Sequence, residues 1–140
     1  MSSFVVDASV AVKWVVSEIH FESARRLLGR DYNLLVPDFF FVEVANVFWK
    51  RVKRGEDSVD DAKVALEAIR AQPLQVHLSL QLMPRAFELA IETQRAVYDC
   101  VYLTLAVKYQ CQMATADEKL FNALQHGPMS ASLCWIEDLP

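Results

Sequence analysis

Short apolar segments alternate along this chain with longer segments of helical periodicity, and this alternation is the feature that most restricts its fold. Each short segment has the length of a buried strand. The expected strands are 4–6, 34–36, 74–78, 112–115 and 132–136. The expected helices are 10–16, 21–28, 38–54, 58–71, 84–93, 98–109 and 117–124. This order predicts an α/β fold with a central, mainly parallel sheet of four to five short strands.

Local signals set several of the helix ends. Asp38 is a suitable N-cap for the long helix 38–54, and Gly55 is a suitable C-terminal stop. Ser58 caps the next helix, and Pro84 lies near the start of a later one.

The bulk composition narrows the class of protein. The 140 residues suit one domain spanning 1–140, and a hydrophobic share of 54% makes long disordered segments unexpected. No stretch resembles a membrane span or a signal peptide, so we expect a cytoplasmic protein with no membrane partner. The three cysteines form no C-x-x-C pair, which argues against a zinc site and a disulfide framework.

Two acidic residues lie where strands are expected to end. Asp7 interrupts the apolar run F-V-V-D-A-S-V at 4–10, and Asp117 follows the expected strand 112–115. Ligands of parallel sheets bind at the carboxyl ends of the strands, so both carboxylates are expected to face one crevice. For Asp117 a helix cap is the alternative, with Thr115 as a second candidate cap and Glu118 as a rival or helper.

Two further acids lie in apolar surroundings. Glu43 lies in F-F-F-V-E-V-A-N-V-F-W, and at helical spacing it shares a face with Asn46 and Lys50. A solvated polar stripe is the alternative. Asp99 lies in A-V-Y-D-C-V-Y-L-T-L-A, where a cap or first-turn role and a site role are equally good interpretations.

Four such acids together make a stronger pattern than any one of them. Carboxylates brought together repel one another unless a cation neutralises them, and hard oxygen ligands suit Mg²⁺ or Mn²⁺. A metal held this way activates water and stabilises the charge that develops on a phosphodiester during hydrolysis. The net charge of −4 does not suggest a nucleic-acid binder, but such a cluster would make a nuclease acidic overall. Lys50, on the face of Glu43, is a candidate phosphate contact.

The order D-A-S, E-V-A-N, Y-D-C-V-Y-L-T-L-A and T-A-D resembles the PIN domain family, and most closely the VapC-type toxin ribonucleases of toxin–antitoxin pairs. The resemblance runs from Phe4 to Trp135. It implies a three-layer α/β/α sandwich and an endoribonuclease that uses Mg²⁺ or Mn²⁺ to cut RNA. It also implies a homodimer that a cognate antitoxin protein holds inactive.

The resemblance implies a role for each residue that matches a family motif. The acidic cluster would be Asp7, Glu43, Asp99 and Asp117. Its polar supports would be Ser9, Asn46 and Thr115, which orient ligands and waters.

Two other families that place an aspartate after a strand fit this sequence poorly. A haloacid-dehalogenase-like phosphatase needs a second aspartate at the position of Ser9, and a response-regulator receiver domain needs one after the strand 74–78. The strongest alternative is a PIN-like protein that binds RNA or a partner without cutting. The helix with Phe39, Phe40, Phe41, Phe48 and Trp49 is apolar nearly all round, which predicts burial on both sides, by the core and by a partner or wholly within one chain.

Overall fold

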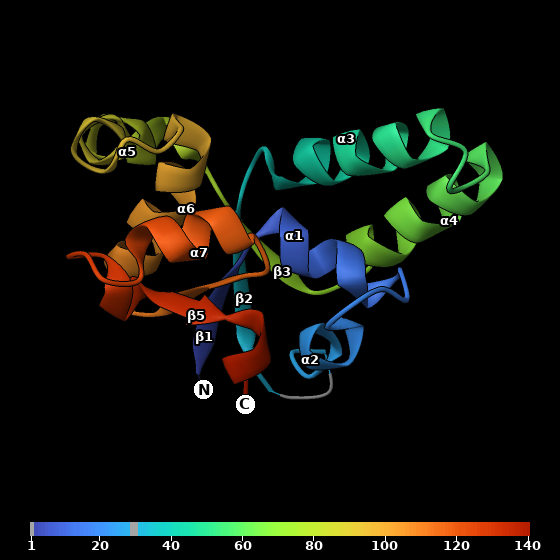
Figure 1. Ribbon diagram of the computed structural model, residues 1–140, viewed down its shortest axis with the longest axis horizontal. Coiled ribbons are helices and arrows are strands. Elements are labelled where there is room, and N and C mark those ends of the chain that lie inside the picture. Colours follow the sequence, from blue (N-terminus) through green and yellow to red (C-terminus); the bar gives the residue numbers. More distant parts are fainter. Residues whose placement is uncertain (1, 29–30) are drawn as a thin grey trace.

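The computed structural model describes residues 2–28 and 31–140 and contains one five-stranded parallel sheet (Figure 1). The strand order is β3-β2-β1-β4-β5. The strands are β1 (Ser3–Val6), β2 (Asn33–Pro37), β3 (Leu74–His77), β4 (Gln112–Thr115) and β5 (Leu133–Trp135). All four pairings are parallel, which confirms the α/β fold predicted from the alternation of short apolar and helical segments.

Helices cover both faces of the sheet. The α-helices are α1 (Ala8–Ala11), α2 (Phe21–Arg25), α3 (Phe40–Lys53), α4 (Val59–Arg70), α5 (Ser79–Thr93), α6 (Val97–Lys108) and α7 (Glu118–Leu124). Short 3-10 helices occupy Val12–Trp14 (η1), Ser130–Ser132 (η2) and Ile136–Asp138 (η3). Figure 1 shows α5 and α6 on one side of the sheet and α1, α3 and α4 on the other, a three-layer arrangement. No helix within the described residues is both long and apolar enough to cross a membrane.

Helix α6 is the centre of the core. All residues from Cys100 to Ala106 are buried, because the sheet packs on one side of the helix and α5 on the other. Helix α3 buries one face only: Phe40, Val44 and Phe48 are buried, whereas Trp49 is 56% exposed. The long aromatic helix is therefore not enclosed by its own chain, and part of its apolar surface is open.

The starts of α3 and α5 differ from the prediction. Asp38 does not cap α3: Phe39 occupies the N-cap position, and the Asp38 carboxylate accepts a hydrogen bond from the Ser79 N–H at 3.2 Å. Asp38 therefore binds the first amide of α5, a helix that begins five residues before Pro84. The predicted end signals at Gly55 and Ser58 are confirmed, since Gly55 has φ +76° and Ser58 accepts from the Asp61 N–H.

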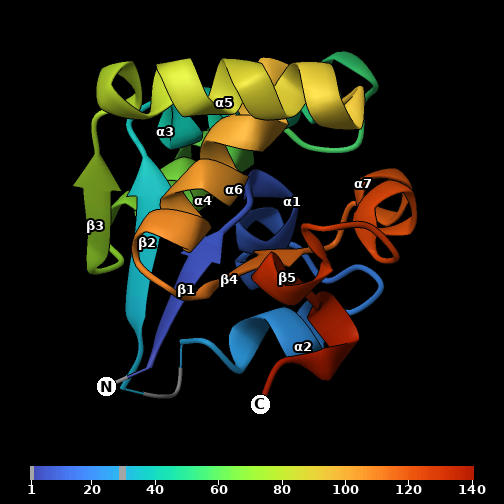
Figure 2. The ribbon, with the colours of Figure 1, turned by 90° about the vertical axis from the view of Figure 1, so that its left-hand side faces the viewer.

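The carboxyl ends of the strands meet at one end of the molecule. Figure 2 shows the strand arrows pointing toward the end where α3 and α5 lie. Asp7 follows β1 directly, and Asp117 follows β4 after one residue. Because β1 and β4 are neighbours in the sheet, the topology brings these two acids to adjacent positions.

Candidate active site

Asp7 is held in a fixed orientation at the end of β1. Its side chain is only 8% exposed, and one carboxylate oxygen, Oδ2, accepts hydrogen bonds from Ser9 Oγ at 2.8 Å and Thr115 Oγ1 at 2.9 Å. Ser9 Oγ in turn accepts from the Ala116 N–H at 3.0 Å. The Asp7 N–H donates to the Ala114 carbonyl at 3.1 Å, which continues the pairing of β1 with β4. These bonds leave Oδ1 available for a ligand.

Burial raises the pKa of Asp7 to about 6. The hydrogen bonds from Ser9 and Thr115 oppose this rise, and the charges of Asp99 and Asp117 add to it. A lone carboxylate in this position carries an energetic cost that a bound cation would remove.

Glu43 lies in the first turn of α3 and is half-buried. The Tyr102 hydroxyl donates to its Oε2 at 3.2 Å. Burial raises the pKa of Glu43 to about 7, and the charges of Asp7 and Asp99 contribute to that rise. Glu43 is therefore not the solvated residue of a polar stripe, which was the alternative interpretation of its position.

Asp99 lies in the first turn of α6 without capping the helix. The N-cap position is occupied by Ala96, and Asp99 Oδ2 instead accepts from Arg95 Nη2 at 3.3 Å. Burial raises the pKa of Asp99; the charge of Arg95 opposes the rise and the charge of Asp117 adds to it. The cap interpretation of Asp99 is therefore wrong, whereas the predicted first-turn position is confirmed.

The cap interpretation of Asp117 is confirmed, and its position beside Asp7 is compatible with the predicted site role. It is the N-cap of α7, where its Oδ1 accepts from the Leu120 N–H at 3.1 Å, while its own N–H donates to Thr115 Oγ1 at 3.0 Å. Its charge still reaches Asp7 and Asp99. Thr115, which is wholly buried, thus connects Asp117 to Asp7 through one hydroxyl.

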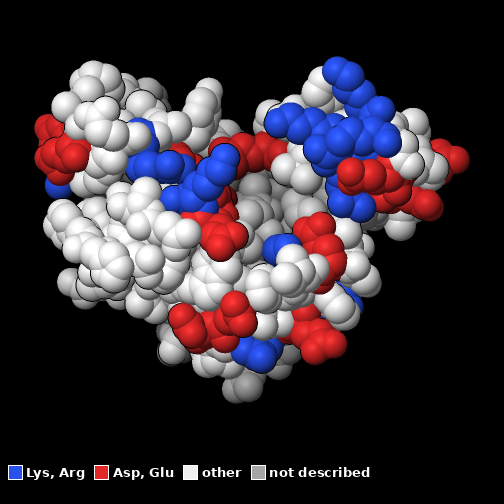
Figure 3. Space-filling view, viewed as in Figure 1, with Lys and Arg blue, Asp and Glu red and all other residues white. Residues whose placement is uncertain are grey.

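The two polar residues predicted to accompany Glu43 on α3 are exposed. Among the described residues, neither Asn46 nor Lys50 makes a side-chain hydrogen bond or an ion pair, so both are free to meet a ligand. Figure 3 shows a notch between two lobes of the molecule, with acidic side chains on its floor and basic side chains on both flanks. In the view of Figure 1 this notch lies between α3 and α5.

Two residues of the site were missed by the sequence reasoning. Arg95 and Tyr102 hold Asp99 and Glu43 through the bonds described above. Tyr102 lies three residues after Asp99 in the same helix, so helical spacing from Asp99 was the signal that could have found it. Arg95 precedes α6 and lies outside the helix, so only its closeness to Asp99 in the chain pointed to it. Arg95 places a positive charge beside Asp99.

The donor set was compared with the requirements of a divalent ion. The four side chains offer only carboxylate oxygens, which suits Mg²⁺ or Mn²⁺ and not a thiol- or imidazole-bound metal. Within the parts of the chain that the structure describes, no three Asp, Glu, His or Cys side chains are arranged to hold one ion together. Mg²⁺ needs no such cage, because it keeps several waters and is held by one or two carboxylates. The residues therefore fit Mg²⁺ in kind and number.

Solved structures share this fold. PAE2754 from Pyrobaculum aerophilum superposes with a TM-score of 0.72 over 97% of this chain and 85% of its own, at 18% identity. VapC20 of Mycobacterium tuberculosis, described as a Sarcin-Ricin loop cleaving toxin, has a TM-score of 0.60 at 18% identity, covering 78% of this chain and 85% of its own. VapBC2 from Rickettsia felis, bound to a DNA fragment of its promoter, has a TM-score of 0.62 at 8% identity, covering 95% and 98%.

One relative is more similar in sequence than these solved structures. It is 35% identical over 118 residues to Ribonuclease VapC3 of Pyrobaculum aerophilum, covering 83% of this chain and 90% of that protein. The family model described as PIN domain matches residues 4–126. The chain therefore belongs to the PIN domain family, in which it is similar to the VapC-type ribonucleases.

Proposed function

We propose that this protein is a metal-dependent endoribonuclease that hydrolyses RNA phosphodiester bonds as the toxin of a toxin–antitoxin pair. The observation that carries the proposal is Asp7, a buried carboxylate with one oxygen fixed by two hydroxyls and three other carboxylates within range of its charge. The relationship to a ribonuclease supports the activity. Solved structures with the same fold, VapBC2 from Rickettsia felis and a toxin–antitoxin complex from Klebsiella pneumoniae, support the antitoxin partner.

The chain's own residues prepare the site for an ion and for RNA. Asp7, Glu43, Asp99 and Asp117 would hold Mg²⁺ or Mn²⁺, one or two of them directly and the others through the waters of the ion, which would supply activation of water and stabilisation of phosphodiester charge. Ser9 and Thr115 orient Asp7, so that its Oδ1 is directed as a ligand. Tyr102 holds Glu43 in the same way. Asn46 and Lys50, exposed on α3, meet the RNA backbone, Lys50 by its charge.

The test is a cleavage assay on single-stranded RNA with Mg²⁺ or Mn²⁺ and with EDTA. The parent protein is expected to cut only with metal, and Asp7→Asn is expected to remove most cleavage while the protein stays folded. Asp60→Asn, on the exposed surface of α4, is the matched control and should cut at the parent rate. RNA binding without cutting under every metal condition would favour the alternative of a non-catalytic PIN-like binding protein.

Two exposed apolar surfaces suit protein partners. On α5, Leu80, Met83, Phe87 and Ile91 are all at least 45% exposed and recur at helical spacing, which suits a homodimer interface. Between α3 and α4 a second apolar groove includes Phe48, Trp49, Val52 and Leu66, and it suits the tail of an antitoxin. We assign the toxin to the cytoplasm, where its RNA substrates and its antitoxin are made.

A further inference from the structure

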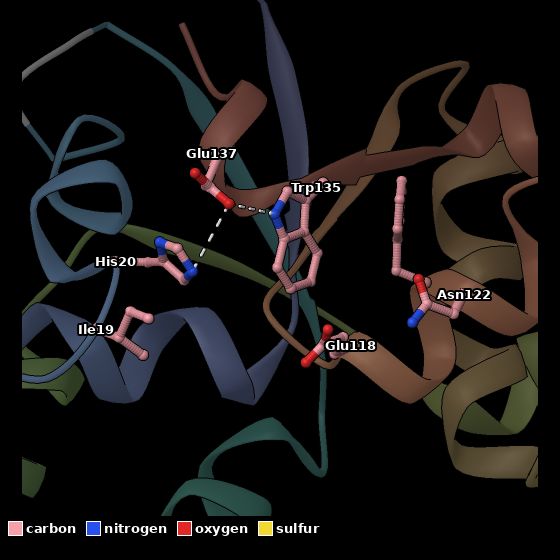
Figure 4. Close-up of a pocket in the computed structure, with 7 residues that line it drawn as sticks. Ile19, His20, Glu118, Asn122, Trp135 and Glu137 are labelled. Atoms are coloured by element: carbon pink, nitrogen blue, oxygen red, sulfur yellow. Dashed lines mark hydrogen bonds and ion pairs between the residues drawn. The ribbon is translucent and has the colours of Figure 1, made fainter.

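A pocket of about 360 Å³ lies beside the acidic cluster and has no role in the proposed chemistry (Figure 4). Ile19 and His20, which precede α2, form one wall, and Glu118 and Asn122 of α7 form another. Trp135, at the end of β5, lies between them, as Figure 4 shows. The volume is within the range of about 300–1,000 Å³ that is usual for small-ligand sites.

The sheet places this pocket next to the candidate active site. Trp135 is paired with Thr115 across β4 and β5, and Thr115 binds Asp7 at the end of β1. Neighbouring strands are about 5 Å apart, so the backbone at Trp135 is about 10 Å from that at Asp7 along the sheet edge. Glu118 directly follows Asp117 in the chain. An RNA strand whose phosphate reaches the acids would bring an adjacent base to the pocket.

The pocket offers an aromatic surface that is already fixed. The Trp135 ring is half-buried, and its Nε1–H donates to Glu137 Oε1 at 3.1 Å. Phe121 packs against it with ring centroids 5.4 Å apart, and His20 meets it edge-on at 6.0 Å. Aromatic rings held in this way are the surfaces on which proteins stack unpaired RNA bases.

The opposite wall is also anchored. The Lys13 ammonium, only 8% exposed, donates to the Ile19 carbonyl at 2.8 Å and pairs with Glu18 at 3.1 Å. His20 adopts φ +67°, and its Nε2 lies 3.7 Å from Glu137 Oε1. The Ile19 side chain is left 73% exposed at the rim, where it can cover a stacked ring.

The charged groups of the pocket are carboxylates, which accept hydrogen bonds and repel phosphate, whereas the Asn122 amide and the His20 ring can also donate. Glu118 and Glu137 bring two carboxylates, Asn122 adds an amide, and no lysine or arginine of the described chain lines the pocket. A carboxylate pairs best with two adjacent donors. On the Watson–Crick edge only guanine presents two adjacent donor groups, its ring N1–H and its exocyclic amino group, because adenine, cytosine and uracil each present a single donor group there.

We propose that this pocket receives a guanine base of single-stranded RNA next to the bond that is cut, stacked on Trp135 and bound through its Watson–Crick edge by Glu118. The inference rests on the proposed ribonuclease function, since it names the RNA element that the site selects. It makes the pocket the specificity-determining part of the cleft.

The test measures binding in EDTA, so that no cleavage is needed. The probes are fluorescent hexauridylates that carry one guanine, one inosine or one adenine, measured by anisotropy. The parent is expected to bind the guanine RNA at least about tenfold more tightly than the adenine RNA. Inosine, which lacks the exocyclic amino group, should lie between them.

Variants separate the two contacts. Glu118→Gln should reduce the preference for guanine over adenine to less than about twofold, because the amide replaces one acceptor with a donor. Trp135→Leu should weaken binding of the guanine RNA about fivefold or more through lost stacking. Glu67→Gln, on the exposed surface of α4, is the matched control and should leave the guanine preference unchanged.

Equal affinity of the parent for guanine and adenine RNA would overturn the proposal, as would an unchanged preference in Glu118→Gln. Displacement of the guanine RNA by N-acetylarginine amide in the parent but not in Trp135→Leu would assign the pocket to a basic side chain of a protein and overturn it too. Failure of this proposal can be distinguished from failure of the proposed ribonuclease function, because binding and cleavage are measured separately. A parent that selects guanine but cuts no RNA with Mn²⁺ would refute only the ribonuclease proposal.

Discussion

Replacing Asp7 by asparagine is expected to stabilise the metal-free protein, and to do so more at higher pH. The folded state raises the pKa of this carboxyl from 3.8 to about 6, chiefly by burial. The folded state therefore favours the protonated form. The contribution of Asp7 to stability is fully present well below pH 3.8 and is lost progressively as the pH rises from about 4 through about 6.

The size of the effect follows from the two pKa values. Linkage between 3.8 and about 6 gives a loss of stability in the parent that is under about 1 kcal/mol at pH 4, about 2 kcal/mol at pH 5 and about 3 kcal/mol at pH 8. Asparagine is neutral throughout, and its side-chain oxygen can accept from Ser9 and Thr115 as Asp7 Oδ2 does. The free energy of unfolding of Asp7→Asn is therefore expected to be higher than that of the parent, by an amount that grows with pH toward about 3 kcal/mol.

The assay is urea unfolding followed by far-ultraviolet circular dichroism at pH 4, 5, 6 and 8 in EDTA, with a constant m-value as the test of two-state behaviour. Asp60→Asn removes the same charge from an exposed position in the first turn of α4, where the carboxylate favours the helix N-terminus, so this control is expected to lose about 0.3–1 kcal/mol and not to gain stability. Added Mn²⁺ should stabilise the parent more than Asp7→Asn, because binding to the folded state only adds stability. A difference that is constant across pH, or a variant less stable than the parent at pH 8, would refute the reasoning.

Three further predictions concern other parts of the structure. Asp99→Asn should be as stable as the parent in EDTA or more so, and Asp99→Ala should cost less than the 0.5–2 kcal/mol of a lost cap, because Asp99 makes no cap bond. Both should show a smaller Mn²⁺ shift in thermal melts, and an unchanged shift would remove Asp99 from the site. Phe87→Asp, on the exposed face of α5, should convert a dimer to a monomer in light scattering after gel filtration, and a persisting dimer would place the interface elsewhere. Lys50→Ala in the Asp7→Asn background should reduce the slope of log affinity for RNA against log salt by about 1.

Strands β1, β2 and β4 were predictable because each is a short apolar run that is buried in the sheet. Strand β3 is partly exposed and was predicted instead from its alternation of apolar and polar residues. Residues 112–115 were predicted as a strand and are β4, and 34–36 lie inside β2. The first helix was harder to predict from the sequence. A helix over 10–16 was expected, but the structure forms α1 from Ala8 and continues as the 3-10 helix η1. The helix begins earlier because the Asp7 carbonyl accepts from the Val10 and Ala11 N–H groups, which closes the first turn directly after β1.

Pairings between distant parts of the chain could not be obtained from local signals. Asp38 has the residue type and position of a cap for α3, yet its carboxylate binds Ser79, 41 residues further along. Parallel pairing of β2 with β3 brings Pro37 beside His77, so the residues that follow the two strands meet at one edge. Only the strand order makes Asp38 a neighbour of α5, and no local pattern contains that order.

The four acids show why the sequence can predict a site but cannot assign each residue to a capping role or a ligand role. For Asp117, cap and site were opposed interpretations, but the structure gives one oxygen to the Leu120 amide and leaves the charge within range of Asp7. A cap bond uses one lone pair of one oxygen, so it does not exclude a metal ligand. For Asp99 the two interpretations do separate, because Arg95 takes the place that a helix amide would have had. The choice between them depends on neighbours in three dimensions, which is why mutation of Asp99 is more informative than mutation of Asp117.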